Sequence, residues 1–384
     1  MKITIKIVMM TVLVVPFLSG CWDNNEAERL LYAHAIGIDF VDNQYKVDLQ
    51  IINLTSVAKS ETPISAEESQ SEVGSATGKT MEEAIANLYK SLDAELFWGH
   101  LTYIIFSEEA LKEKRVNEVI DSFIRYYETR YRIWVYSTKD DIKEILLTVP
   151  INNLPITISK LDDPLNSYSQ YSFIRPINIR ELIIGLNEPN HEIVIPFVTA
   201  KENWSVSKGK SPKPTIIGGS LLSSTSYKET LLGSKIAGLQ WMNSKSKEGE
   251  VSFLLKKDKE ESLASIFIQD VNVKVTPIIK QNDVTFDVTI SVKALGNIIP
   301  SGAKMTDLEK GVKDTIKQEV KRTYMEALEH DVDIYRLSEF VYRYHNKEWK
   351  RLQENGKVKL DEDSLSIDVK IRKFKSGRKS IDNL

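Results

Sequence analysis

Cysteine is nearly absent from this chain, because Cys21 is the only one in 384 residues. A single cysteine cannot form an internal disulfide, so the fold must depend on buried apolar surface. Histidine is scarce as well. The five histidines are His34, His100, His191, His330 and His345. No two of them stand at the spacing of a zinc-ligand pair, and we therefore expect no metal site and no cofactor.

An excess of positive charge is also missing. The chain has 51 Lys+Arg against 54 Asp+Glu, a formal charge of −3. Removal of residues 1–20 would take Lys2 and Lys6 with it and would leave a formal charge of −5. Residues 22–28 carry acids and no base. This balance argues against nucleic acid as a partner and against a polybasic membrane anchor.

Motifs for catalysis are lacking too. Residues 74–80 resemble a phosphate-binding loop but are one residue short, and the segment before them is polar rather than an apolar strand. We predict instead that Thr80 caps a helix and that Glu83 bonds back to the Thr80 N–H. His191-Glu192 lacks the second histidine of a metalloprotease helix, and Asp333 stands where a helix should begin. We therefore expect no enzyme.

The N-terminus has the order of a bacterial export signal. Lys2 and Lys6 precede an apolar stretch over residues 7–18, which is too short to span a membrane comfortably. The run Leu18-Ser19-Gly20-Cys21 then matches a lipobox. We predict cleavage after Gly20, with diacylglyceryl on the Cys21 sulfur and an acyl group on its amine. An ordinary secreted protein and an uncleaved anchor remain alternatives.

Two acyl chains hold a protein stably on a bilayer, whereas one binds only marginally. The predicted organisation is a signal peptide over residues 1–20 and a lipidated tether over 21–29. Three domains follow, over 30–150, 151–247 and 248–384. Residues 30–150 alternate strand and helix patterns, and the middle segment is rich in loops with short strands. The predicted fold class is α+β, with three mixed domains that each contain a sheet and packed helices.

Several elements are indicated by hydrophobic periodicity. The first domain should open with a hairpin over 33–40 and 45–54, followed by a helix from Met81. In the last domain, alternating valines predict antiparallel strands near 271–275 and 284–292. Apolar residues at i+4 steps from Leu308 predict one long helix. A second helix should carry Ile334, Leu337, Val341 and Tyr344, and a final strand should alternate from Leu365 to Ile371.

Five stretches of the mature sequence resemble a known family. They are Cys21-Trp-Asp23 with Leu30–Asn53, Gly78–Ile85, Leu96–Leu101, Gly218-Gly219 through Trp241, and Asp333–Lys350. On these stretches the chain resembles the Ger(x)C proteins, the lipoprotein C subunits of spore germinant receptors. Within Leu96–Leu101 we expect structural roles rather than ligand contacts. Phe97 and Trp98 should cover the end of a helix, Gly99 should permit a sharp turn, and His100 should lead into a strand.

The resemblance implies three mixed domains, no enzymatic activity, and a place on the outer face of the spore inner membrane. It also implies integral membrane A- and B-type receptor subunits as partners, beside the bilayer held through Cys21. The chain would then be an accessory subunit needed for the germination response to nutrients. The alternative from a different class is a lipoprotein that captures a solute for a transporter.

The chain departs from the family pattern near its end. The family commonly has glycine where this chain has Arg336 and Ser338, and proline where it has Asn346. Because glycine and proline interrupt helices, we expect a more regular helix here.

Overall fold

A computed structural model describes Ile3 and residues 30–375, apart from 53–69, 114, 126–129, 190, 208, 225, 258–259 and 282. Helices are written α, 3-10 helices η and strands β. The first elements are β1 (Leu30–Val41), β2 (Gln44–Ile52), β3 (Ser71–Gly78), α3 (Met81–Tyr89), β4 (Glu95–Phe97), η3 (Trp98–His100), β5 (Tyr103–Ser107), α4 (Glu108–Leu111), α5 (Arg115–Arg125), β6 (Trp134–Thr138) and α6 (Ile142–Leu146).

The middle elements are η4 (Ile151–Asn153), η5 (Ile156–Ile158), α7 (Pro164–Gln170), β7 (Ile177–Asn178), α8 (Ile179–Asn187), β8 (Ile193–Lys201), β9 (Ser205–Val206), β10 (Gly209–Lys210), β11 (Lys213–Leu222), β12 (Tyr227–Leu232), η6 (Gly233–Lys235) and η7 (Ala237–Gln240). The last are β13 (Glu248–Lys257), β14 (Glu260–Ile279), β15 (Val284–Ile298), α9 (Met305–Leu328), α10 (Leu337–Tyr344), α11 (Asn346–Leu352), β16 (Gln353–Glu354), β17 (Lys357–Val358) and β18 (Leu365–Lys375).

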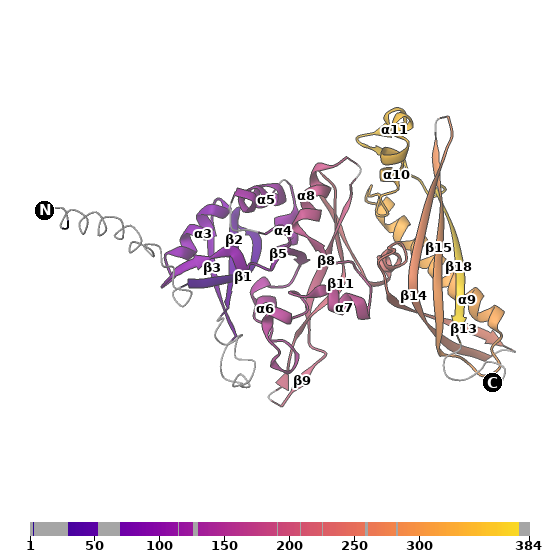
Figure 1. The fold of residues 1–384 in the computed structure, drawn as a ribbon, viewed down its shortest axis with the longest axis horizontal. Helices are drawn as coiled ribbons and strands as arrows, with labels where there is room; N and C mark the ends of the chain where they lie inside the picture. The colour runs from indigo at the N-terminus through magenta and orange to yellow at the C-terminus, as the bar shows by residue number, and fades with distance from the viewer. Residues whose placement is uncertain are drawn as a thin grey trace.

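One large sheet runs through the first two thirds of the described chain, in the order β12-β11-β8-β6-β5-β1-β2-β3. The predicted hairpin is confirmed as β1 and β2, which turn at Asp42 and Asn43, both with positive φ as a tight hairpin turn requires. Strands β1, β5, β6 and β8 are parallel neighbours at its centre (Figure 1). Helices cover both faces of such a sheet, so its central strands are buried throughout.

The two faces of this sheet belong to two different cores. Within β5, Ile104 and Phe106 pack with α3, α4, α5 and α8, whereas Tyr103 and Ile105 pack with α6. This alternation follows from the period of two along a strand. Figure 1 accordingly draws α3, α4, α5 and α8 above the sheet and α6 below it.

The described part of the middle segment forms no separate sheet beyond the two-stranded β9–β10 hairpin. Strands β8, β11 and β12 lie in residues 151–247, yet they continue the sheet that β1 and β5 begin. The expectation of a separate middle sheet is therefore wrong, because β8 pairs with β6 at Ser137, beyond the two residues of β6 that β7 pairs. The α+β class is confirmed, and the three domain boundaries remain a prediction.

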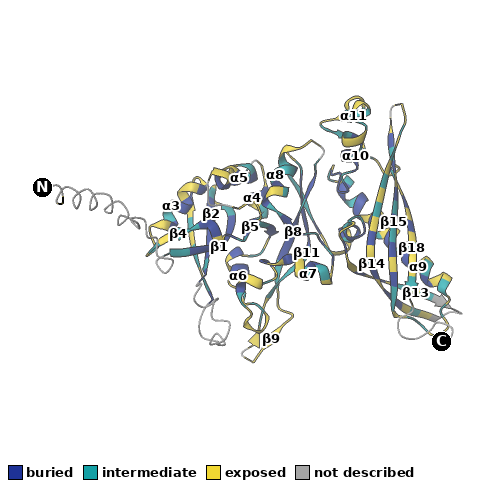
Figure 2. Ribbon diagram, in the orientation of Figure 1, coloured by how far each residue is buried: buried dark blue, intermediate teal, exposed yellow. Residues whose placement is uncertain are grey.

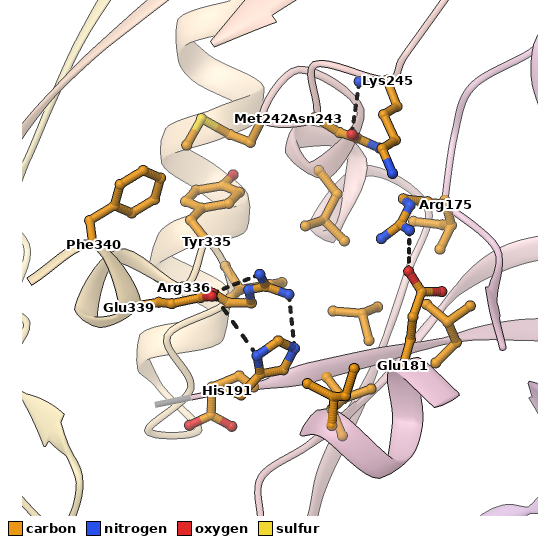
Figure 3. Close-up of a pocket in the computed structure, with 18 of the residues that line it drawn as sticks. Arg175, Glu181, His191, Met242, Asn243, Lys245, Tyr335, Arg336, Glu339 and Phe340 are labelled. Atoms are coloured by element: carbon orange, nitrogen blue, oxygen red, sulfur yellow. Dashed lines mark hydrogen bonds and ion pairs between the residues drawn. The ribbon is translucent and has the colours of Figure 1, made fainter. Parts of the chain in front are cut away.

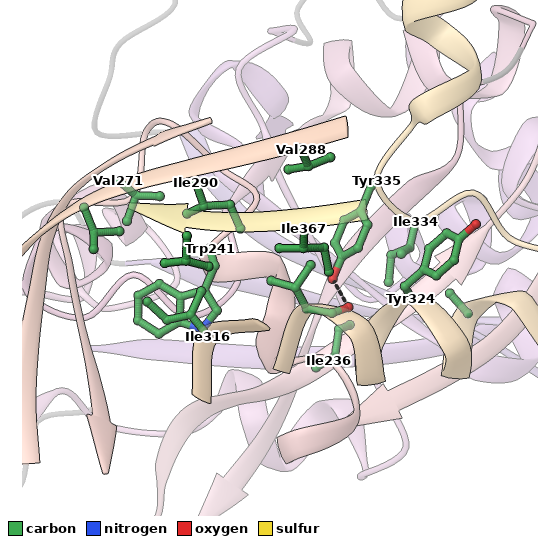
Figure 4. Close-up of a cluster of buried hydrophobic side chains, with 14 of the residues drawn as sticks. Ile236, Trp241, Val271, Val288, Ile290, Ile316, Tyr324, Ile334, Tyr335 and Ile367 are labelled. Carbon is green, nitrogen blue, oxygen red and sulfur yellow. Dashed lines mark hydrogen bonds between the residues drawn. The ribbon is translucent and has the colours of Figure 1, made fainter. Parts of the chain in front are cut away.

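The last part of the chain folds around a second sheet, in the order β13-β14-β15-β18. The predicted strands, the long helix and the final strand are all confirmed here, as β14, β15, α9 and β18. Helix α9 lays Leu308, Val312, Ile316, Val320 and Tyr324 on the sheet, each no more than 1% exposed. Figure 4 shows this core, in which the Tyr335 hydroxyl donates to the Val320 carbonyl at 2.9 Å.

The two sheets share apolar contacts rather than being joined by a bare linker. Ile174, Leu221 and Leu231, from the first sheet and its flank, belong to the same buried cluster as Trp241 and the second sheet. The indole of Trp241 is 1% exposed and donates to the Glu319 carboxylate of α9 at 2.5 Å. Buried contact of this kind favours a fixed relation between the two sheets.

The segment after α9 is less regular than expected. Ile334 precedes α10, which begins only at Leu337, and Arg336 has φ +53° and ψ +42°, in the left-handed region. His345 separates α10 from α11 with φ −137° and ψ 52°. The expectation of a more regular helix is wrong, because tertiary contacts hold the breaks without glycine or proline.

Candidate functional site

The residue with the clearest sequence-based role, Cys21, lies outside the described residues, as does Gly20 before it. Lipidation at Cys21 therefore stays a prediction. The described chain begins nine residues later, at Leu30, as the first residue of β1. Within the described residues, no helix combines the length and the apolar character that crossing a bilayer requires.

One concave site of the described chain lies between the two sheets, as a cavity of about 650 Å³. One wall comes from residues 173–194, including α8, and the other from η7 and from α10 (Figure 3). Its apolar lining includes Ile184, Met242 and Phe340, and charged side chains of both signs stand among them. Cavities between domains are common positions for small ligands.

The two walls are joined by Arg336, which is why its unusual backbone matters. Its guanidinium donates to His191 Nε2 at 2.9 Å and lies 2.6 Å from Glu339 Oε2. The other oxygen of Glu339 pairs with Arg343, one helical turn further along α10. A non-glycine residue in the left-handed region is strained, and these contacts offset that strain.

The contact with Arg336 fixes the protonation of His191. Arginine can only donate, so Nε2 of the imidazole must accept and the proton must sit on Nδ1. Burial and the nearby charge of Arg336 lower the pKa of His191 to about 4. His191 is thus a neutral ring at neutral pH, held against α10 by a cation.

Glu192, the next residue, faces a different set of groups. Its carboxylate lies 3.6 Å from the Lys357 ammonium. Burial raises the pKa of Glu192 to about 7, with Lys357 opposing the shift and Asp333 adding to it. Asp333 accepts from the N–H groups of Leu337 and Ser338, the first two residues of α10, at 2.8 and 2.7 Å. The helix therefore starts four residues later than predicted, although Asp333 still bonds its first turn.

A metal ion is one conceivable occupant of this region. Single ligand atoms of Glu188, His191 and Glu339 lie within 4.8 Å of one another. However, both oxygens of Glu339 already face Arg336 and Arg343, so a divalent cation would compete with two guanidinium groups. The donor set suits a salt-bridge network better than a metal.

A second buried histidine, His34, serves the first sheet. Its Nε2 lies 2.8 Å from Asp162 Oδ1, and its Nδ1 lies 2.9 Å from Gln50 Oε1. Burial opposes protonation of His34, but the hydrogen bond and charge of Asp162 prevail and raise its pKa. Since His34 and Asp162 are 1% and 9% exposed, no substrate can reach them. The pair ties β1 to the segment before α7.

Two other predicted features have structural outcomes. Thr80 caps α3 by accepting from the Glu83 N–H at 3.2 Å, as expected, and Gly74 and Gly78 lie in strand β3 rather than in a phosphate loop. The Glu83 carboxylate accepts from the Lys79 N–H at 2.7 Å, so the predicted bond to the Thr80 N–H is wrong. Beside the Lys79 N–H, as beside the Thr80 N–H, the Glu83 carboxylate lies at the start of α3, where the helix dipole favours a negative charge.

The Leu-Phe-Trp-Gly-His segment forms β4 and the turn η3, and Trp98 donates to the Tyr89 hydroxyl at the end of α3 at 3.0 Å. A Cβ on Gly99 would lie 2.5 Å from the Phe97 ring, which explains the glycine. The structural reading of these residues agrees with their contacts.

Comparison with known proteins places this architecture in a family. Residues 23–200 match the model described as the spore germination protein N-terminal domain. Residues 217–374 match the model described as spore germination B3/GerAC like, C-terminal. This chain belongs to the GerAC family of spore germination proteins.

Individual members of the GerAC family are distant but collinear with this chain. Spore germination protein KC of Bacillus subtilis (strain 168) is 24% identical over 398 residues, covering 96% of this chain and 93% of its own length. Spore germination protein B3 of the same organism is 22% identical, covering 94% and 95%. The crystal structure of the GerBC protein superposes with a TM-score of 0.53 at 17% identity, covering 88% of this chain and 96% of its own, and therefore supports the shared fold.

Proposed function

We propose that this chain is a lipid-anchored accessory subunit of a spore germinant receptor. The observation that carries the proposal is the match of both GerAC models, which together extend over most of the mature chain. The lipobox at Leu18–Cys21 adds the anchor. In this role the chain sits on the outer face of the spore inner membrane, docks on integral membrane receptor subunits, and is needed for the response to nutrients.

The short tether supports a position close to the bilayer. Leu30 lies nine positions after Cys21, and an extended chain advances at most about 3.6 Å per residue, so Leu30 stays within about 32 Å of the Cys21 backbone. Two acyl chains retain the protein without any spanning helix. The folded body then works within reach of subunits embedded in the same membrane.

Replacement of Cys21 tests the anchor. Cys21→Ala should abolish incorporation of radiolabelled fatty acid, release the chain from the spore membrane fraction and weaken germination on nutrients. Ser19→Ala is the matched control, because it changes the same segment and keeps the cysteine. Full germination by Cys21→Ala spores at native protein level would show that the lipid is dispensable.

Docking on membrane subunits needs a separate test. Crosslinking in intact spores, followed by affinity isolation of the wild-type chain, should recover polytopic receptor subunits in stoichiometric yield. A chain that is acylated and membrane-bound but recovers none of them would contradict docking while leaving the anchor in place.

Capture of a small solute is the second candidate, because the cavity between the sheets offers about 650 Å³ and charges of both signs. A zwitterionic amino acid could pair its carboxylate with Arg175 and its ammonium with Glu181, although these two side chains now pair with each other. A thermal-shift screen of amino acids and sugars separates the two functions, since a docking subunit should show no shift.

A further inference from the structure

A set of exposed apolar side chains gathers at one end of the first sheet. We call it the Trp204 patch, and its members are Leu147, Val149, Ile151, Leu154, Ile158, Trp204 and Val206, which are 39–58% exposed. They come from the segment that runs from the end of α6 through η5, and from Trp204 and Val206 at the start of the β9–β10 hairpin. Five of them, Val149, Ile151, Leu154, Ile158 and Trp204, line one cavity. Figure 1 draws β9 at the lower tip of the molecule, below α6, and Figure 2 colours that tip as exposed. Contiguous exposed apolar surface of this kind marks an interaction site.

Beneath the Trp204 patch lies a cavity of about 390 Å³ whose charged lining residues are all positive. Val149, Leu154, Ile158 and Trp204 line it together with Lys160 and Lys213, and no described lining residue is acidic. The Lys213 ammonium donates to the Val149 carbonyl at 2.6 Å and to the Ser211 hydroxyl at 2.7 Å. This cationic character contrasts with the net negative charge of the whole chain.

A third lysine stands beside the cavity rather than in its lining. Lys201 at the end of β8 stands directly opposite Lys213 at the start of β11. Like charges directly opposite each other on two strands are destabilising, and an anion bound between them would relieve this repulsion. Desolvation also lowers the pKa of Lys160 and of Lys213. An anion bound beside these two ammonium groups would stabilise their charged forms.

The start of the folded chain lies beside this patch. Leu30 packs in a small cluster with Tyr32, Ile52 and Ile156, and Ile156 also lines the cavity. Leu30 is nine residues from Cys21, so a lipid on Cys21 would keep the patch near the bilayer. Aliphatic side chains and tryptophan with lysines around them suit the boundary between acyl chains and headgroups.

We propose that the Trp204 patch is a membrane contact that inserts its apolar side chains into the outer leaflet and binds the phosphate of anionic phospholipid at Lys160, Lys201 and Lys213. The orientation that it gives to an anchored chain rests on the proposed lipidation of Cys21. With the patch on the bilayer, α5 on the opposite side faces away from the membrane (Figure 1). The anchor holds the chain at the surface, and the patch fixes which side faces down.

A single thiol on the patch tests this contact in the acylated full-length chain. Cys21 is the only native cysteine and is blocked when acylated, so Val206→Cys adds one reactive thiol for an environment-sensitive fluorophore. In vesicles of phosphatidylcholine with phosphatidylglycerol, the emission at position 206 should shift to the blue. Ile124→Cys on α5 is the matched control, since Ile124 is also exposed, at 44% against 58% for Val206, and should show no shift.

The unacylated chain separates the patch from the anchor. Protein made without residues 1–21, which has neither the apolar leader nor the acylated cysteine, should float with vesicles that contain phosphatidylglycerol and stay in solution with phosphatidylcholine alone. Each of Lys160→Gln and Lys213→Gln should weaken the partition about fivefold, and Trp204→Ser should weaken it as well. The charged controls Lys310→Gln and Lys317→Gln on the exposed side of α9 should leave it unchanged.

Three outcomes would overturn the proposal. One is an acylated chain that floats with vesicles while position 206 stays in water, which leaves the anchor intact. Another is flotation of the unacylated chain that ignores both lysine variants. The third is a blue shift at position 206 without vesicles, which means that protein, such as a second copy, covers the patch. Failure of acylation alone affects only the anchor.

Discussion

Replacement of Arg336 by glycine and, separately, by alanine distinguishes the two effects of this residue on stability. Arg336 has a left-handed backbone, which costs a non-glycine residue about 1–2 kcal/mol. Its guanidinium also joins His191 to Glu339 across the interdomain cavity. Alanine keeps the backbone strain and loses the contacts, whereas glycine loses both.

The size of each effect follows from the geometry. Hydrogen bonds to charged groups contribute about 1.5–3 kcal/mol, and the 39% exposure of the Arg336 side chain reduces this by solvent screening to about 1–2 kcal/mol. Arg336→Ala should therefore lower the free energy of unfolding by about 1–2 kcal/mol. Arg336→Gly should be about 1 kcal/mol more stable than Arg336→Ala, and thus close to wild type.

The same substitutions should change the titration of His191. Without the guanidinium, Nε2 is free to take a proton, and a nearby positive charge is gone. The pKa of His191 should rise from about 4, while burial still holds it below its ordinary value. Labelling the five histidines with ¹³C gives five signals, and His191→Asn assigns the relevant one.

Urea unfolding at pH 7 measures the free energies of unfolding of the Arg336 variants, and the histidine titration measures the pKa of His191. Arg343 is the matched control, because it pairs with Glu339 but lies inside helix α10. There glycine should be less stable than alanine by about 1 kcal/mol, the opposite order to position 336. The reasoning is refuted if Arg336→Gly is no more stable than Arg336→Ala, or if the pKa of His191 does not move.

Three further outcomes are expected. Burial raises the pKa of Glu192 from 4.5 to about 7, so the folded state loses about 3 kcal/mol as pH rises through that window, and Glu192→Gln should lose this pH dependence in urea unfolding. Gly238→Ala should destabilise by about 1–3 kcal/mol, measured by thermal unfolding, because its Cβ would lie 2.6 Å from the Tyr335 hydroxyl. Thr80→Ala should cost about 1 kcal/mol and speed amide exchange at Glu83, with Thr80→Ser restoring both.

Local pattern was a sound guide wherever one face of an element is buried. The alternation in β15 and the i+4 steps of α9 gave both elements their type, because burial on one side imposes a period of two or of 3.6 on the residues. Strand β3 was not predicted, because it lacks a buried apolar face that would impose such a period. It is an edge strand of Ser, Gly, Ala and Thr, with little apolar surface to reveal a period.

The candidate site between the sheets was out of reach of such reasoning. His191 and Arg336 are 145 positions apart, and their contact depends on how β8 and α10 approach each other. The sequence has charges at Arg336, Glu339 and Arg343, a spacing that is equally typical of one face of a helix in solvent. Glu339 is only 7% exposed, and this burial depends on tertiary contacts.

By itself the sequence determined the scarcity of thiols, the lipobox around Cys21, the family and most strands and helices, since each depends on residues close together in the chain. Tertiary structure alone decided that β8, β11 and β12 extend the first sheet. It also decided that Arg336 keeps a left-handed turn and that the Trp204 patch meets a cationic cavity. These features depend on contacts between distant segments, and their free energies are settled only when the whole chain packs.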